Sequence, residues 1–350
     1  MRLSFDGYLL RFGAVFCAVL LAAWLYVLGF PMAFLPGGYP AWVARSDMLR
    51  ECQLGRIAFF GDSRLEAGVV PALLPVDAVN FGLAAGTALE VHSAVRRALS
   101  CADPPKQVVI SLVADHFGPM DRFFWVNDLL YGFISPAELL EAERLASALG
   151  DTRSFTVART PDGLSGRMRN WLYAVRFPSL YFSSLSQGRL FGRLATNRAR
   201  LAEVRRSRGF SEYQGGQAGA APAEPGFAPV PMQTALFERT LEMLRDKGVE
   251  TLLLTMPTAG PDDGGDAAYA AWLRNTVSRF PGVRLVTQTI PGWPARMFAD
   301  GAHMTGAGAC LFSTKLAACI VDGRLRPGCD LAWRETDVPP GPPRAAGIAR

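Results

Sequence analysis

The stretch IAFFGDSRL, which runs from Ile57 to Leu65, decides how the rest of the chain can be arranged. An apolar run of strand length ends at Gly61, and Ser63 follows two residues later. A short apolar run closed by a glycine is typical of a buried strand in a parallel sheet, although a glycine, Asp62 and a serine in a row also suit an ordinary turn. Ligands of parallel sheets bind beyond the carboxyl ends of the strands, so we expect Ser63 to lie where chemistry is done.

A second stretch with chemistry-bearing residues, DGAHMTGAG, begins at Asp300 near the other end of the chain. Asp300 precedes His303 by three residues in a glycine-rich loop, just ahead of an apolar helix. A serine hydroxyl needs a base to take its proton, and a histidine base needs a group to orient it. The other two histidines of the chain are His92 and His116, so few bases are available. The two stretches together predict a triad of Ser63, His303 and Asp300.

These stretches resemble the first and last sequence blocks of the SGNH/GDSL hydrolases. In that family the serine is the nucleophile and an Asp-x-x-His pair supplies its orienter and base, which implies these roles for Ser63, Asp300 and His303. The second block of the family is a glycine whose backbone N–H joins the oxyanion hole. Gly82, in the sequence VNFGLAAG, fits this block. The resemblance therefore implies an oxyanion hole formed by the N–H groups of Ser63 and Gly82.

The third block of the family, Gly-x-Asn-Asp, is where this chain departs from the pattern. The matching strand over residues 107–113 runs into the sequence ADHF instead. An ionised Asp115 in place of the oxyanion-binding asparagine would repel an oxyanion. His116 either contacts the substrate or pairs with Asp115. We expect Asp62, Asp115 and His116 as possible substrate-binding residues.

The fold that this resemblance implies is a three-layer α/β/α flavodoxin-like sandwich of the SGNH hydrolase type, with a parallel sheet and a helical insertion. The resemblance to the family covers roughly residues 53–116 and 248–320. Periodicity predicts helices over residues 87–99, 136–149, 234–247, 267–280 and 307–320, and strands over residues 107–113, 251–256 and 283–286. Along the chain we expect a cytoplasmic N-terminus at residues 1–11, a transmembrane helix at 12–30, a linker at 31–50, the catalytic domain at 51–118 and 232–333, a helical insertion with a mobile Gly-, Ala- and Pro-rich loop at 119–231, and a disordered tail at 334–350.

The apolar run over residues 12–30 predicts one membrane-spanning helix, because about 20 apolar residues suffice to span a bilayer. A cleavable signal peptide has a shorter core followed by a small-residue cleavage site. This run ends instead in Trp24, Tyr26 and Phe30, which suit an interfacial aromatic belt. The arginines that precede it favour a cytoplasmic N-terminus. We therefore favour an uncleaved anchor over a signal peptide, with the catalytic domain in the periplasm or outside the cell.

The cysteines agree with an oxidising compartment. Cys52 and Cys101 each precede a predicted parallel strand, so both lie at the same edge of the sheet and a bridge between them is geometrically plausible. Cys310 is equally compatible with a small buried thiol. No Cys-x-x-Cys sequence occurs, so we expect neither a metal site nor another cofactor.

The predicted insertion carries an aromatic part and a basic part. The aromatic part includes residues 123–125 and 171–173, and it is either a helical subdomain that buries its own apolar face or a lid or bilayer-facing surface. The basic part, residues 189–208, contains seven arginines against one glutamate. A solvated basic helix is the simpler interpretation, and contact with an anionic glycan or lipid headgroup is the alternative. We do not expect nucleic acid as a partner outside the cytoplasm.

The predicted triad favours serine-dependent transfer or hydrolysis of an acyl ester. The family resemblance, together with the predicted membrane anchor, implies an O-acetyltransferase or esterase that acts on a cell-envelope or exported polysaccharide. Members that resemble this chain often work with a multi-spanning acyltransferase that exports the acyl group, so such a membrane partner is expected. Two other classes stay open. One is a membrane-anchored esterase for lipids or small esters, and the other is a non-catalytic scaffold that keeps the fold.

Overall fold

The computed structural model describes residues 5–120, 122–155, 172, 175–176, 192–213, 227–260 and 267–337. Its centre is a five-stranded parallel sheet with the order β2-β1-β3-β4-β6, which confirms the predicted α/β class. The strands are β1 (Ile57–Gly61), β2 (Ala78–Gly82), β3 (Gln107–Ser111), β4 (Glu250–Leu253) and β6 (Val283–Leu285). Gly61 lies opposite both Gly82 and Ser111, so the first three strands end level with one another.

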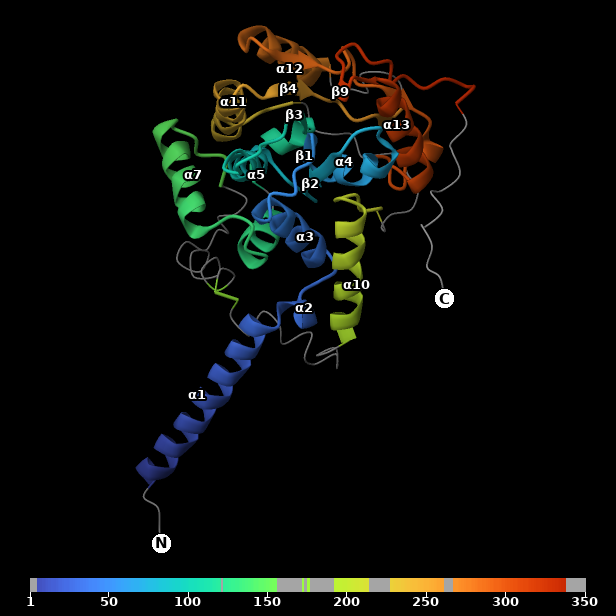
Figure 1. Cartoon of the computed structure of the whole chain (residues 1–350). Helices are drawn as coiled ribbons and strands as arrows, with labels where there is room; N and C mark the ends of the chain where they lie inside the picture. Colours follow the sequence, from blue (N-terminus) through green and yellow to red (C-terminus); the bar gives the residue numbers. More distant parts are fainter. Residues whose placement is uncertain are drawn as a thin grey trace, which may run out of the picture.

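Helices cover both faces of the sheet (Figure 1). Along β1, Ala58 and Phe60 belong to one hydrophobic cluster, whereas Ile57 and Phe59 belong to the other, as the two-residue period of a strand requires. The Phe60 side is covered by α5 (Ala88–Leu99), α11 (Pro231–Asp246) and α12 (Ala267–Arg279). The Phe59 side is covered by α4 (Ser63–Gly68) and α13 (Gly306–Ala318).

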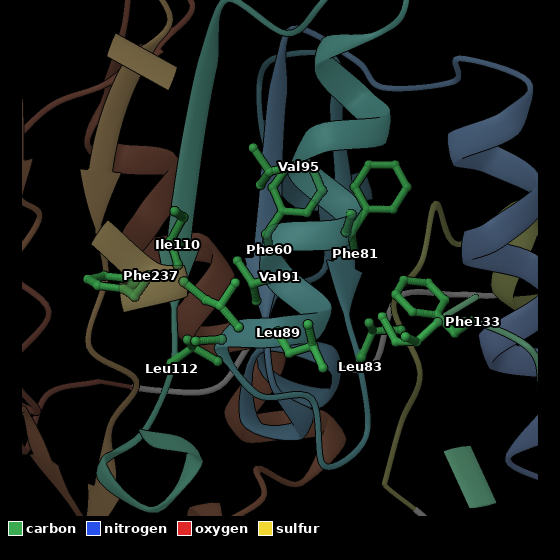
Figure 2. Packing of buried hydrophobic residues seen from close by; sticks show 14 of the residues in the cluster. Phe60, Phe81, Leu83, Leu89, Val91, Val95, Ile110, Leu112, Phe133 and Phe237 are labelled. Carbon is green, nitrogen blue, oxygen red and sulfur yellow. The ribbon is translucent and has the colours of Figure 1, made fainter. Parts of the chain in front are cut away.

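The core on the Phe60 side holds the carboxyl end of β1 in place (Figure 2). The rings of Phe60 and Phe81 stack with their centroids 5.1 Å apart, and both are fully buried beside Val91 and Val95 of α5. Full burial of one such side chain contributes about 1.5–3 kcal/mol. The start of α5 is set by a capping box between Thr87 and Glu90.

The N-terminal helix α1 (Phe5–Gly29) projects from the body of the molecule as a single rod (Figure 1). Its segment Gly7–Gly29 is long and apolar enough to cross a membrane. Its side chains are largely exposed in the isolated chain, with Leu10 77% accessible, and apolar surface of this extent is unfavourable in water. An apolar N-terminal helix of the signal or anchor kind, together with two disulfides, indicates an exported protein.

Residues 31–50 form two helices that pack into the core, so the prediction of a linker in this segment is wrong. They are α2 (Pro31–Phe34) and α3 (Tyr39–Arg50), which bury Phe34 and Trp42 in the main hydrophobic cluster. Pro31 and Pro40 stand within the first two positions of these helices. A proline is tolerated in the first turn because its missing N–H has no intrahelical partner there. Within the predicted linker, Pro31 and Pro40 therefore mark the starts of packed helices.

The expected insertion contributes α6 (Arg122–Phe124), a π-helical segment η3 (Trp125–Leu130), α7 (Pro136–Ala148) and α10 (Gly192–Arg206). Helix α10 lies beside α2 and α3 (Figure 1). The Asn197 side chain of α10 donates to the carbonyl oxygens of Met32 and Leu35 at 2.8 and 2.9 Å, and Arg205 pairs with Glu51. The basic helix is therefore packed against the N-terminal helices. The aromatic residues 171, 173, 177, 181 and 182, and the larger part of the expected mobile loop and tail, lie outside the described residues.

Short elements complete the described chain. They are η1 (Pro71–Leu73), η2 (Ala114–Phe117), η5 (Ala295–Met297), the strand pair β5 (Thr258–Ala259) and β7 (Gly292–Trp293), and the hairpin β8 (Ile320–Val321) with β9 (Arg324–Leu325). Cys52 pairs with Cys101 across the starts of β1 and β3, as expected, and Cys319 pairs with Cys329. Cys310 is a buried free thiol.

Candidate functional site

Ser63, His303 and Asp300 lie in a continuous hydrogen-bonded row. The Oγ atom of Ser63, the first residue of α4, is 2.7 Å from Nε2 of His303. The Nδ1 atom of His303 is 2.8 Å from Oδ2 of Asp300. Serine and histidine are 240 residues apart in the sequence and meet because α13, which follows the histidine loop, packs against α4. The structure thus brings together the three residues that the two sequence stretches singled out.

The loop that carries His303 is shaped by the Asp300 side chain. Oδ1 of Asp300 accepts the backbone N–H groups of Ala302 and His303, at 3.0 and 2.8 Å, which leaves Oδ2 for the imidazole. Gly301 adopts φ of +82°, a left-handed conformation that glycine reaches without strain. Burial opposes ionisation of Asp300, but the hydrogen bonds from His303 and Ala302 outweigh it and hold the pKa of Asp300 below its ordinary value.

This arrangement determines which ring nitrogen of the neutral His303 imidazole carries the proton. An ionised Asp300 only accepts hydrogen bonds, so Nδ1 of His303 donates to it and Nε2 is left as the acceptor for the Ser63 hydroxyl. Nucleophile, base and orienter in this order can take a proton from the serine during attack on a carbonyl. Ser63 and His303 are partly accessible, so a substrate can approach them.

The structure gives Asp62 a structural part in place of the expected substrate contact. Asp62 is fully buried, and its Oδ1 accepts the N–H groups of Arg64 and Leu65 as the N-cap of α4. Its Oδ2 accepts the N–H of Val113 at 2.9 Å. A carboxylate that is buried and holds three backbone donors has no face left for a substrate. Asp62 instead fixes the first turn of the helix that presents Ser63.

His116 belongs with Asp62 and not with Asp115. Its Nδ1 lies 3.5 Å from Oδ2 of Asp62, so it approaches the buried end of the site from η2. Asp115 is exposed on the same short helix. The pairing of His116 with Asp115 that the sequence left open is therefore not the one observed, and a substrate contact for Asp115 stays a prediction.

The N–H of Gly82 does not face the candidate site. It donates to Oδ1 of Asn80 at 2.8 Å, and the Asn80 amide in turn donates to the carbonyl oxygens of Leu65 and Val69. A Cβ at Gly82 would lie 2.4 Å from the nitrogen of Glu66, so glycine is required here for close contact between β2 and α4. The expected oxyanion donor Gly82 is corrected accordingly: it is a packing position.

Other backbone donors remain near Ser63. Among the described residues, no acceptor is found for the N–H of Ser63 itself or for that of Ala85. Ala85 lies in the loop after β2 and has φ of +58°, a strained conformation for alanine. That loop is tied to the end of β1 by the bond from the Leu83 N–H to the Gly61 oxygen. Strained backbone of this kind often accompanies functional sites.

The sequence analysis missed Tyr213 as a member of the site. Its ring lies parallel to the imidazole of His303, with the centroids 4.0 Å apart and the planes 4° from parallel. It follows α10 in the segment that was expected to be mobile. No local pattern distinguishes this tyrosine from the others in the chain, because the contact joins residues 90 positions apart.

Two other features do not add to the site. A cleft of about 910 Å³ lies at the opposite, amino-terminal edge of the sheet, where Arg56 and Lys106 stand just before β1 and β3. None of the three residues of the row lines it. Within the described part of the chain, no cluster of three His, Cys, Asp or Glu residues is placed to hold a metal ion.

Comparison of this chain with known protein families, with curated proteins and with solved structures finds no match.

Proposed function

We propose that this chain is a serine-dependent esterase or O-acyltransferase of the SGNH type that acts on an acyl ester of a cell-envelope or exported polysaccharide. The observation that carries the proposal is the row formed by Ser63, His303 and Asp300, with distances of 2.7 and 2.8 Å. The strand order β2-β1-β3-β4-β6 supports the finer fold assignment, since it is the flavodoxin-like order 2-1-3-4-5 of the sheet strands, with helices on both faces. Ser63 lies just beyond the carboxyl end of β1, at the edge where such sheets bind ligands.

In the proposed reaction, Oγ of Ser63 attacks the carbonyl carbon of the ester while Nε2 of His303 takes the hydroxyl proton. The tetrahedral intermediate collapses, His303 returns the proton to the leaving alcohol oxygen, and the acyl group stays on Ser63. A water or a sugar hydroxyl then gives its proton to His303 and attacks the acyl carbonyl. The bond from the acyl carbon to Oγ of Ser63 breaks, His303 returns the proton to Oγ, and an acid or a new ester is released. Asp300 holds the imidazole in the required tautomer and balances its positive charge.

The oxyanion needs donors other than Gly82. The N–H groups of Ser63 and Ala85 are the backbone candidates, since neither has an acceptor among the described residues. Removing one oxyanion donor typically costs about 10²–10³ in rate. Backbone donors are not lost by side-chain changes, so this proposal does not require the asparagine that is missing after β3.

An exported protein with one apolar N-terminal helix fits a substrate in the cell envelope. A single uncleaved anchor would keep the triad near the membrane, where a multi-spanning acyltransferase partner could supply the acyl group. The exposed Asp115, at the end of β3, is the residue we assign to binding an acceptor sugar hydroxyl.

The test is labelling of the full-length chain with a serine-reactive phosphonate, together with turnover of a p-nitrophenyl ester. We expect the wild-type chain to be labelled and to hydrolyse the ester, and Ser63→Ala and His303→Ala to abolish both. The matched controls are Ser147→Ala, at an exposed helical serine, and His92→Gln, at a histidine that lies between α5 and α11 and away from the row. Loss of labelling in a control, or a folded and unlabelled wild-type chain, contradicts the proposal.

A second comparison separates a transferase from an esterase. With a donor ester and an acylatable oligosaccharide present, we expect Asp115→Asn to leave acylation of Ser63 unchanged and to slow transfer to the sugar. If the variant instead raises simple ester hydrolysis, by up to about tenfold for about 1.4 kcal/mol of barrier, Asp115 opposes the oxyanion and does not bind the acceptor.

A further inference from the structure

We propose that Tyr213 is a positioning residue that holds His303 and Asp300 in working geometry, so that the segment following α10 completes the site. The inference rests on the proposed function, because it concerns the base of that same triad.

The contact with His303 is geometrically restrictive. The two nitrogen atoms of the imidazole are occupied by Ser63 and Asp300, which fix the ring at its edge. The Tyr213 ring covers one face at a centroid distance of 4.0 Å and an interplanar angle of 4°. Tilting the imidazole toward that face would bring it into the tyrosine ring. A π-face of tyrosine also attracts a cation, so it favours the imidazolium that forms during the reaction.

The hydroxyl of Tyr213 acts on the third member of the row. The pKa of Tyr213 is raised, first by burial and then by the neighbouring Asp300 carboxylate. The protonated hydroxyl can therefore act as a donor toward Asp300, whose other donors are the imidazole and the backbone N–H groups of its own loop.

The segment that presents Tyr213 is anchored at several points. The N–H of Ser211 donates to the carbonyl oxygen of Glu66 at 3.2 Å, in the helix that begins with Ser63. The Arg200 guanidinium of α10 donates to the Ser211 hydroxyl and, at 3.3 Å, to the Glu212 carbonyl. Fully buried Arg45 donates to the Gly209 carbonyl and pairs with Glu66 at 3.1 Å. Arg200, from the basic run expected to be solvated, and buried Arg45 thus hold the tyrosine segment against the nucleophile helix.

Two substitutions separate the ring from the hydroxyl. Tyr213→Phe keeps the stacked ring and loses the hydroxyl beside the charge of Asp300, so we expect a loss of no more than about tenfold in kcat. Tyr213→Ala removes both contacts and frees the imidazole, and we expect a loss of about 100-fold, the scale of a misplacement of about 1 Å in a catalytic group. A positioning role predicts that kcat falls while KM for a small ester stays within about twofold.

The experiment measures phosphonate labelling rate, kcat and KM on full-length chains in detergent, with thermal unfolding as the check on folding. If Tyr213→Ala does not fold, Arg200→Ala carries the test, because it releases the segment without touching the ring. Its matched control is Arg198→Ala, at an exposed position of the same helix. We expect Arg200→Ala to lower kcat about tenfold or more, and the control to match wild type.

The outcomes distinguish this inference from the proposed function. A wild-type chain that is labelled, with kcat unchanged in folded Tyr213→Ala or Arg200→Ala, overturns the positioning role alone. A rise in KM with constant kcat assigns Tyr213 to substrate binding and also overturns it. A folded wild-type chain that is not labelled overturns the proposed function, and the positioning role with it.

Discussion

The Nδ1 atom of His303 lies 2.8 Å from Oδ2 of Asp300, three residues earlier in the same loop. An amide at this position presents either a donor or a weaker acceptor to the imidazole, and it no longer balances an imidazolium charge. We expect Asp300→Asn to lower ester turnover by about 10³–10⁴-fold, the scale of the corresponding change in the serine protease triad. The measurement is kcat on a p-nitrophenyl ester, with Asp330→Asn in an exposed loop as the matched control. Wild-type turnover in Asp300→Asn would exclude Asp300 as the orienter.

Asp62 is expected to matter for stability. Asp62→Ala removes the N-cap of α4 and leaves the Val113 N–H without its acceptor. Loss of a cap alone costs about 0.5–2 kcal/mol, and an unsatisfied buried donor adds about 1–3 kcal/mol. We expect Asp62→Asn to be the milder change, because its remaining oxygen can still cap the helix. Urea unfolding of both variants, beside Asp330→Ala, measures the difference. Equal stability of Asp62→Ala and wild type would show that these bonds contribute nothing net.

His92 predicts a pH dependence of stability that has no connection with the candidate site. Burial between α5 and α11, followed by the positive charge of Arg96, lowers the pKa of His92 to about 4, and its Nδ1 lies 3.1 Å from the Thr240 hydroxyl. The unfolded chain binds a proton near pH 6.5, so between pH 6.5 and 4 only the unfolded state is protonated. The free energy of unfolding therefore falls as the pH falls through this window, by up to about 3 kcal/mol.

The measurement is urea unfolding at pH 7.5 and 5.0 for wild type and His92→Gln. We expect the difference between the two pH values to be smaller in the variant, which cannot titrate at this position. An identical difference in both chains would assign the pH dependence to other groups.

The N-terminal helix α1 is predicted to be retained in the mature protein. The end of α1 is built into the body of the protein, since Val27 is buried and the Tyr26 ring contacts Phe34 at 5.2 Å. The Trp24 side chain also donates to the carbonyl oxygen of Val175 at 2.9 Å. Cleavage after this region would remove these contacts, so we expect α1 to remain part of the mature chain. N-terminal sequencing decides, and a start near residue 30 would identify a cleaved signal.

An impermeant thiol reagent tests the orientation of the same helix. A cysteine introduced by Ser278→Cys, at an exposed position of α12, is expected to react in intact cells once the outer membrane, if present, is permeabilised. Labelling only after disruption of the inner membrane would reverse the predicted topology.

Much of the fold could be predicted because its signals are local. The apolar run before Gly61 is β1, and the predicted helix over residues 87–99 is α5 within one residue. The prediction differs from the structure at residues 31–50, where a linker is predicted and two helices with prolines in their first turns are found. A proline is compatible both with a linker and with the start of a helix. Only the burial of Phe34 and Trp42 shows that the prolines in this region begin packed helices.

The candidate site, too, could be predicted only in part from local sequence. The family resemblance predicts Gly82 as an oxyanion donor, yet its N–H donates to the Asn80 side chain, two residues earlier. The direction of one N–H depends on side chains that surround it, and the buried Asn80 amide is held there by α4. The position of Gly82 at the end of a strand could therefore be predicted, and its hydrogen-bond partner could not.

By itself the sequence determined the elements and turns whose causes lie within a few residues: the strand before Ser63, the capping box of α5, and the loop in which Asp300 accepts the N–H groups of Ala302 and His303. Only the tertiary structure decided that His303 meets Ser63 across 240 residues and that the Tyr213 ring covers its imidazole. These contacts follow from the packing of α13 on α4 and of α10 on α3. Hydrophobic periodicity determines which face of an element is buried, but the partner of that face is set by the shape and volume of the whole core.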